Sequence, residues 1–275
     1  MNPFNKKWVV VAAVAMVCAS ASLANAIPLP SGFIQLSDND AESLINAPGT
    51  SGTTLDQGDR LRGIFDINSI EGLNPATLAT YTPFAGNELT GIFDIIVLSK
   101  SGGPGAWSYI FGATGNLSTA NAAVELYTDP SLDYTRLGCA TTAACEATAS
   151  NGSLWAAFGF GAYSFWNAST ITDDISAIGS LVPPFTGGAY NAGLDLLVNN
   201  TGRIILQQEC IFTGSGLFND TCASGSLLGT QGANTPFNSF SNVDFTLTVP
   251  EPETLALLGV GLLGMGISLR KRKSA

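Results

Sequence analysis

The sequence predicts a mainly β protein, with a β-sandwich-like body that contains little helix and an apolar helix at each end of the chain. Short apolar or alternating runs recur between stretches rich in turn residues, which is typical of all-β domains. Gly, Ser, Thr, Asn and Ala dominate the body, and no long stretch of it shows a sustained helical period. An uninterrupted apolar segment near each terminus is the exception, and each segment predicts a helix.

The first 26 residues have the organisation of a secretory signal peptide. Two lysines precede an apolar run over residues 8–17, and small residues follow up to Ala24 and Ala26. This order predicts export by Sec-type machinery and cleavage after Ala26, so that Ile27 begins the mature protein. An uncleaved anchor is the alternative, although the apolar run is short for a membrane-spanning helix.

Residues 27–248 form the predicted body, which is long enough for one sizeable domain or two small ones. Candidate strands are residues 61–67, 91–99, 107–111, 122–127, 154–160, 203–212 and 243–249. Residues 189–198 fit either a strand or a short helix, and residues 173–181 fit one or two helical turns. Clusters of Gly and Pro at 102–105 and 183–184 interrupt these segments.

The body contains an internal repeat, in which residues 61–67 (LRGIFDI) recur as residues 89–95 (LTGIFDI). Strand alternation places the Gly and Phe of each copy on one face and Asp66 or Asp94 on the other. Two similar strands in one sheet are sufficient to explain the repeat. The functional alternative is that Asp66 and Asp94 share a cation or another ligand.

Charge and residue types exclude several classes of function. The body keeps 5 basic and 19 acidic residues, a net charge of −14. Nucleic-acid binding needs a basic surface and is therefore not expected, whereas an acidic surface permits calcium binding. The chain has no histidine, which excludes histidine-dependent triads and histidine-ligated metals. Residues 37–42 are acidic but lack the Gly and the distant Glu of a calcium loop.

Four cysteines remain after Cys18 leaves with the signal peptide. An even number in an oxidising compartment predicts two disulfides, for which sequence alone allows three pairings. We expect the local pairs, Cys139 with Cys145 and Cys210 with Cys222, each of which would close a small loop. A four-cysteine zinc site is the alternative, although the spacings are unlike those of such sites.

The last 27 residues, 249–275, have an organisation of their own. Val249-Pro250-Glu251-Pro252 comes first, an uncharged apolar run over residues 254–269 follows, and Arg270-Lys271-Arg272-Lys273 comes last. The run would reach about 24 Å as a helix, and the basic residues should stay cytoplasmic by the positive-inside rule. An inner-membrane intermediate with the body outside is therefore expected before any processing.

This order of motif, glycine-spaced apolar helix and basic terminus resembles the PEP-CTERM sorting signal of Gram-negative bacteria. The resemblance implies that Val249, Pro250, Glu251 and Pro252 are recognition residues for exosortase, a membrane processing enzyme. It also implies a destination at the cell surface or in the extracellular matrix. Because the family accompanies exopolysaccharide production, it implies an association with exopolysaccharide or biofilm.

The leading hypothesis is a non-catalytic exported protein without a required cofactor. A carbohydrate- or calcium-binding β-sandwich module is the first alternative, and a glycoside hydrolase built on paired carboxylates is the second. Tyr163, Phe165 and Trp166 lie among Gly, Ser and Asn residues and are candidate sugar-stacking aromatics, whereas Trp155 and Phe158 are expected in the core.

Overall fold

The computed structural model describes residues 29–72, 80–81, 86–175, 187–210, 217–227 and 236–251. The predicted mainly β body with little helix is confirmed. One short helix, α2 (Thr142–Ala149), lies within these ranges. The strands are β1 (Gly32–Ile45), β2 (Arg60–Gly72), β3 (Thr80–Tyr81), β4 (Glu88–Gly103), β5 (Ala106–Ala113), β6 (Ala122–Asp129), β7 (Ser153–Gly159), β8 (Phe165–Thr170), β9 (Gly188–Asn199), β10 (Gln208–Glu209), β11 (Phe218–Asn219), β12 (Thr221–Leu227) and β13 (Ser241–Val249).

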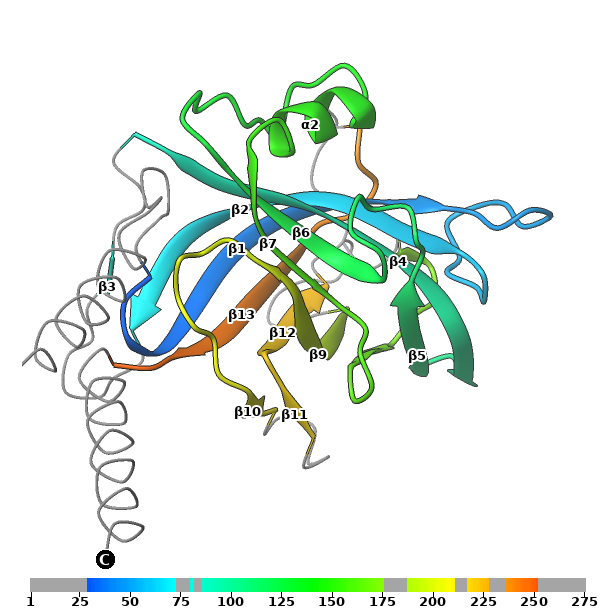
Figure 1. Cartoon of the computed structure of the whole chain (residues 1–275). Helices are drawn as coiled ribbons and strands as arrows, with labels where there is room; N and C mark the ends of the chain where they lie inside the picture. The colour runs from blue at the N-terminus through cyan, green and yellow to red at the C-terminus, as the bar shows by residue number, and fades with distance from the viewer. Residues whose placement is uncertain are drawn as a thin grey trace, which may run out of the picture.

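Eight of the strands close into a ring (Figure 1). Their order is β2-β1-β13-β12-β9-β7-β6-β4, and β4 pairs with β2 to complete the circuit. Strands β8 and β5 make a second connection between β9 and β4. β8 pairs with residues 188–193 of β9 and β5 with residues 95–103 of β4, while β7 and β6 pair with the opposite ends of those two strands. One barrel-like sheet therefore surrounds the core.

Most predicted strands are confirmed. Residues 61–67, 91–99, 107–111, 122–127, 154–160 and 243–249 correspond to β2, β4, β5, β6, β7 and β13, with only Phe160 beyond the end of its strand. The ambiguous segment 189–198 is β9. The prediction for 203–212 is wrong over most of its described part, where Gln208–Glu209 alone forms a strand. Most of segment 173–181 lies outside the described residues. Strands β1, β8 and β12 escape prediction because Asp, Asn, Ser and Gly, which favour turns, interrupt their apolar positions.

The ring encloses the main apolar core, and a smaller core lies outside it. Trp155, Phe65 and Phe158 are among the largest side chains buried inside. The outer core forms where α2 packs over β2 and β4, and it includes Ile64 and Ile92. Apolar residues on both faces of these two strands therefore have a partner layer.

The internal repeat closes the ring. Its two copies pair in antiparallel fashion around Ile64 and Ile92, which places Gly63 opposite Phe93 and Phe65 opposite Gly91. A methyl group on either glycine would overlap the facing aromatic ring. The glycines therefore leave the space that the two phenylalanine rings occupy, and the interpretation as two similar strands in one sheet is confirmed.

We expect Gly63→Ala and Gly91→Ala each to lower the free energy of unfolding by about 2–3 kcal/mol, because overpacking forces side chains and backbone to shift. At each position the new methyl would also meet a backbone carbonyl, that of Ala41 or Glu125. Urea denaturation followed by tryptophan fluorescence measures the change. Gly103→Ala is the control, since no heavy atom lies within 4 Å of its Cβ position. Equal losses in all three variants would contradict the prediction.

Candidate functional sites

Three carboxyl groups of β1 point into the ring. Asp38, Asp40 and Glu42 occupy alternate positions of the strand, and each residue is at most 2% exposed. They line a cavity of about 40 Å³ whose other walls are mainly apolar. The acidic stretch at residues 37–42 is therefore part of a buried strand and not a surface turn.

These carboxyl groups fill a gap between β1 and β13. The ladder between the two strands stops partway along both and resumes at one isolated pair. Within the gap, Asp38 Oδ1 accepts a hydrogen bond from Val243 N at 2.6 Å, and Asp40 Oδ1 accepts one from Ser241 N at 2.5 Å. The carboxylates thus replace the missing main-chain acceptors, since a buried N–H requires a partner.

Burial makes these acids hold protons more tightly. It raises the pKa of Asp40 to about 6, and it raises the pKa of Asp38 and Glu42 well above the ordinary range, with the charge of Asp40 as the second cause. Ser241 Oγ lies 2.6 Å from Asp40 Oδ2 and 3.0 Å from Glu42 Oε2, but a hydroxyl has one proton to donate. The cluster is therefore expected to retain protons close to neutral pH.

We expect the protein to lose stability as pH rises through about 6, the pKa of Asp40 in the folded protein. The unfolded carboxyl titrates near pH 4, so between these values the folded state binds more protons and unfolding becomes easier as pH rises. Asp40 alone contributes about 1 kcal/mol of this loss between about pH 5 and 7.5.

Urea denaturation at about pH 5 and at about pH 7.5 measures the change in the free energy of unfolding. Asp40→Asn keeps the shape of the side chain and should reduce the dependence on pH. Glu209→Gln removes an exposed carboxylate on β10, which perturbs none of the three buried acids, and should leave the dependence unchanged. Identical pH dependence in wild type and Asp40→Asn would refute the assignment to Asp40.

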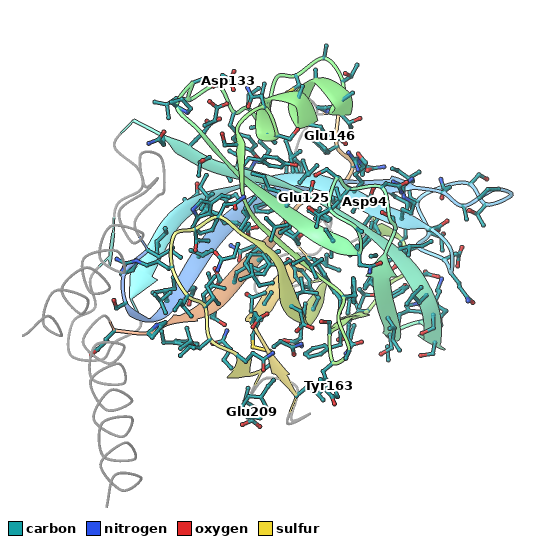
Figure 2. All side chains as sticks on the ribbon, viewed as in Figure 1. Asp94, Glu125, Asp133, Glu146, Tyr163 and Glu209 are labelled. Atoms are coloured by element: carbon teal, nitrogen blue, oxygen red, sulfur yellow. A yellow bond between two sulfur atoms is a disulfide. The ribbon has the colours of Figure 1, made fainter. Side chains whose placement is uncertain are left out.

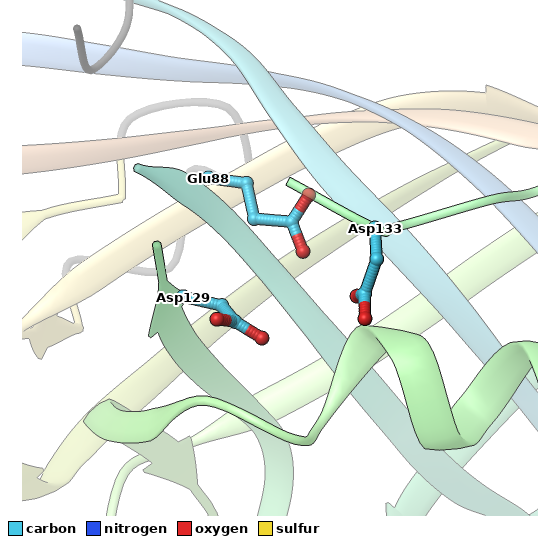
Figure 3. A group of neighbouring side chains, drawn as sticks. All are labelled: Glu88, Asp129 and Asp133. Carbon is cyan, nitrogen blue, oxygen red and sulfur yellow. The ribbon is translucent and has the colours of Figure 1, made fainter. Parts of the chain in front are cut away.

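A second acidic cluster lies where two neighbouring strands end (Figure 3). Glu88 begins β4 and pairs with Asp129, the last residue of β6, while Asp133 comes from the loop that follows. One carboxylate oxygen of each lies within 4.8 Å of the others. Two oxygens that are each about 2.4 Å from one calcium ion can be this far apart, so the three groups can share an ion.

The electrostatics of this cluster also suit a cation. Glu88 Oε1 is buried and has no hydrogen-bond partner among the described residues. Burial raises the pKa of Glu88, and the carboxylates of Asp133 and Asp129 raise it further. A divalent ion would relieve this repulsion, and water or main-chain carbonyls would complete the six to eight oxygen ligands that calcium takes.

The aspartates of the internal repeat are not brought together. Asp94 is fully buried and forms ion pairs with Arg60 at 2.5 Å and with Arg62 at 2.7 Å. Arg62 also forms an ion pair with Glu146 of α2 at 2.9 Å. Figure 2 labels the two acids, Asp94 and Glu146. Asp66 pairs in the ladder with Thr90, which is roughly 13 Å along β4 from Asp94. Asp94 therefore anchors arginines, and the two aspartates of the repeat do not form a shared site.

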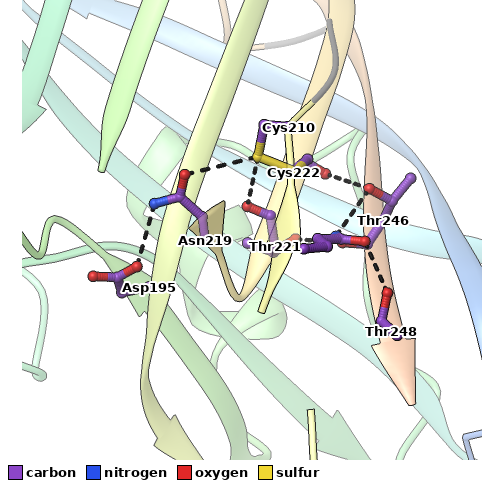
Figure 4. Close-up of a disulfide and its surroundings, with 8 residues drawn as sticks. Asp195, Cys210, Asn219, Thr221, Cys222, Thr246 and Thr248 are labelled. Atoms are coloured by element: carbon purple, nitrogen blue, oxygen red, sulfur yellow. Dashed lines mark hydrogen bonds between the residues drawn. A yellow bond between two sulfur atoms is a disulfide. The ribbon is translucent and has the colours of Figure 1, made fainter. Parts of the chain in front are cut away.

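Both predicted disulfides are confirmed. Cys139 bonds to Cys145 with 5.6 Å between Cα atoms, and Cys210 bonds to Cys222 with 5.4 Å. The first ties α2 to the loop before it. The second holds the segment after β10 against β12 (Figure 4). Cys145 lies in α2 and Cys222 in β12, so each bond ties a loop to an element of regular structure and reduces the conformational freedom of the unfolded chain.

The aromatic side chains follow the predictions only in part. Tyr163 is 65% exposed, on the loop before β8 (Figure 2), and Trp155 and Phe158 are buried as expected. The surface prediction for Trp166 is wrong, because this ring is 5% exposed and stacks on Tyr190 with 6.1 Å between centroids. Its indole points into the core because alternation along β8 turns every second side chain inward.

The chain leaves the ring at the predicted sorting sequence. Val249, the last residue of β13, is 1% exposed, and Glu251 two residues later is exposed. Pro252, the basic tail and the predicted signal cleavage site at Ala24, Ala26 and Ile27 lie outside the described residues. Within the ranges that are described, no helix has the length and hydropathy to cross a membrane.

These features define an exported protein in which a β body is followed at once by a C-terminal sorting tail. The tail is a PEP-CTERM protein-sorting motif, which matches residues 248–273. This motif identifies the protein as one that is exported and processed by an exosortase-type membrane enzyme. Neither a curated protein nor a solved structure shows significant similarity to the chain.

Proposed function

We propose that this protein is a non-catalytic component of the cell surface or extracellular matrix of a Gram-negative bacterium, where it associates with exopolysaccharide or biofilm. The PEP-CTERM motif at residues 248–273 is the observation that carries the proposal. Two disulfides suit an oxidising location outside the cytoplasm. The motif acts as an address, so what the protein does at its destination depends on the body.

Several features of the body favour a non-catalytic role. The chain has no histidine for general acid–base chemistry. Asp38, Asp40 and Glu42 could supply a pair of catalytic carboxylates, but they face a cavity of about 40 Å³. That volume holds about two or three water molecules and is too small for a sugar ring. Asp38 and Asp40 are better explained as acceptors for N–H groups of β13, and Glu42 as a partner of the Ser241 hydroxyl.

Processing can be tested on protein recovered from the matrix. Intact mass and peptide mapping should show Ile27 at the N-terminus and no Arg270-Lys271-Arg272-Lys273 tail. Replacing the Pro250-Glu251-Pro252 segment with alanines should leave the protein full length and in the membrane fraction, because the processing enzyme loses its recognition residues. Asp244→Ala, on the outer face of β13, should be processed normally. An intact tail on the extracellular form would contradict this route.

Association with exopolysaccharide is tested by sedimentation. The processed protein should sediment with exopolysaccharide purified from the producing cells and remain soluble without it. It should be washed from the matrix of a mutant that makes no exopolysaccharide. Free solubility in both preparations would refute the association while leaving the sorting assignment intact.

A second candidate function is calcium binding at Glu88, Asp129 and Asp133. Three carboxylate groups converge, and one of them, Glu88, has a buried oxygen without a partner among the described residues, which favours this function. Bound calcium would join the start of β4 to the end of β6 and to the loop that leads to α2. It would thereby stabilise this end of the ring in an extracellular setting.

Thermal unfolding in calcium and in EDTA tests this function. We expect calcium to raise the melting temperature by several degrees, which corresponds to about 1–2 kcal/mol at a concentration well above the dissociation constant. Asp129→Asn should remove the increase because the site loses a charged ligand. Glu209→Gln, at an exposed carboxylate on β10, is the matched control and should keep it. An equal response to calcium in both variants would exclude the site.

A further inference from the structure

The outer side of the ring carries a row of polar side chains, of which all but one are neutral. Asn167 of β8 pairs in the ladder with Asn191 of β9, which pairs with Ser224 of β12, which pairs with Asp244 of β13. Two residues along the strands, Ser169 and Ser226 extend the pattern. We define the polar face as Asn167, Ser169, Asn191, Ser224, Ser226 and Asp244.

The register fixes the direction and spacing of these side chains. Their neighbours along each strand, such as Trp166, Ala192, Ala223 and Phe245, are buried in the core. Strand alternation therefore turns the polar face outward, where Asn167 and Ser169 are exposed and the other four are partly exposed. Adjacent positions repeat at about 4.8 Å across the strands and about 6.7 Å along them.

The hydrogen-bonding groups of the polar face are unused. Within the described part of the chain, none of its six side chains makes a hydrogen bond to another protein group. Amide and hydroxyl groups both donate and accept. The face therefore offers an ordered array of donors and acceptors to a partner or to water.

Most of the polar face is uncharged. Five of its six side chains are neutral amides or hydroxyls, Asp244 is acidic, and none is basic. Charged side chains elsewhere on the body keep the protein soluble. The need for solubility therefore does not explain why this face carries serine and asparagine. A charged partner would require counter-charges. A neutral partner rich in hydroxyl groups fits the array.

The sheet is hollowed at the β5–β8 end of this face. Trp107, Ser108, Ser169 and Ile171 are among the residues that line a shallow depression of about 290 Å³. Ser108 and Ser169 are direct ladder partners, so the depression continues from the polar face. Its volume approaches about 300 Å³, the lower end of the range for small-molecule sites. It combines apolar surface with hydroxyl groups, as sugar binding requires.

We propose that the polar face binds a neutral, extended polysaccharide that lies across the strands, with one sugar unit in the hollow between β5 and β8. This inference rests on the proposed association with exopolysaccharide and names the glycan class and the surface that contacts it. The strand spacing brings successive polar side chains to successive sugars of such a chain. An anionic glycan is disfavoured because the body carries a net charge of −14.

Affinity electrophoresis of the full exported protein tests the proposal, with hydroxyethyl cellulose as the neutral probe and alginate as the anionic comparator. We expect retardation by the first and not by the second. The double variant Asn167→Ala with Asn191→Ala should bind about tenfold more weakly, since two hydrogen-bonding amides are lost. Ser224→Ala with Ser226→Ala is a second, independent test. The matched control is Asn68→Ala with Ser101→Ala, at exposed positions of β2 and β4.

The outcomes separate this inference from the proposed function. Undiminished retardation of both double variants, with unchanged urea midpoints, would overturn the polar face as the binding surface. Retardation by alginate alone would overturn the neutral glycan class. In either case, sedimentation with native exopolysaccharide would still support the proposed function. Failure of that sedimentation would remove the proposed function itself.

Discussion

The pairing of β2 with β4 is the interaction on which the rest of the structure depends. It turns an open sheet into a ring, so that one layer of strands can bury an apolar face on its own. The close approach depends on two reciprocal contacts, Gly63 against Phe93 and Gly91 against Phe65. A single seven-residue motif thus supplies both sides of the seam, because antiparallel pairing places the glycine of one copy under the phenylalanine of the other.

Once the ring is closed, the shortage of cations decides how its acids are neutralised. Three of the five basic residues of the body form ion pairs with other acids. Arg60 and Arg62 pair with Asp94, and Lys100 lies 2.8 Å from both Asp56 and Asp173. The interior acids of β1 have N–H and O–H donors beside them, and Arg136 contacts the main-chain carbonyl of Asp40 and lowers the pKa of its carboxyl group. Burial outweighs these contacts, so protons are the main source of neutralisation. At the cluster of Glu88, where Asp133 is exposed, the proposed calcium ion would neutralise the carboxylates instead.

Local sequence signals predicted what local chemistry determines. Cysteine spacing predicted both disulfides, the repeat predicted two similar strands, and the order of residues 249–275 predicted the sorting motif. The acidic cluster depends instead on the register that sets Glu88 opposite Asp129, which no short motif contains. β1 escaped prediction for a related reason. Its inward positions carry Asp38, Asp40 and Glu42, and the two aspartates accept main-chain N–H groups of β13 where the ladder between the strands stops. Pairing partners, and not composition, define these sites.

The same register explains how the protein can fold before it is processed. Gly32 at the start of β1 pairs with Val249 at the end of β13, so the two ends of the body leave the ring side by side. The predicted signal peptide and the predicted apolar run would both be held in the membrane at that stage. Only residues 250–253 separate the ring from the apolar run, a reach of about 14 Å at most. Adjacent ends would allow the ring to close while both predicted membrane segments are in place. The short connection would then hold the recognition residues close to a membrane enzyme.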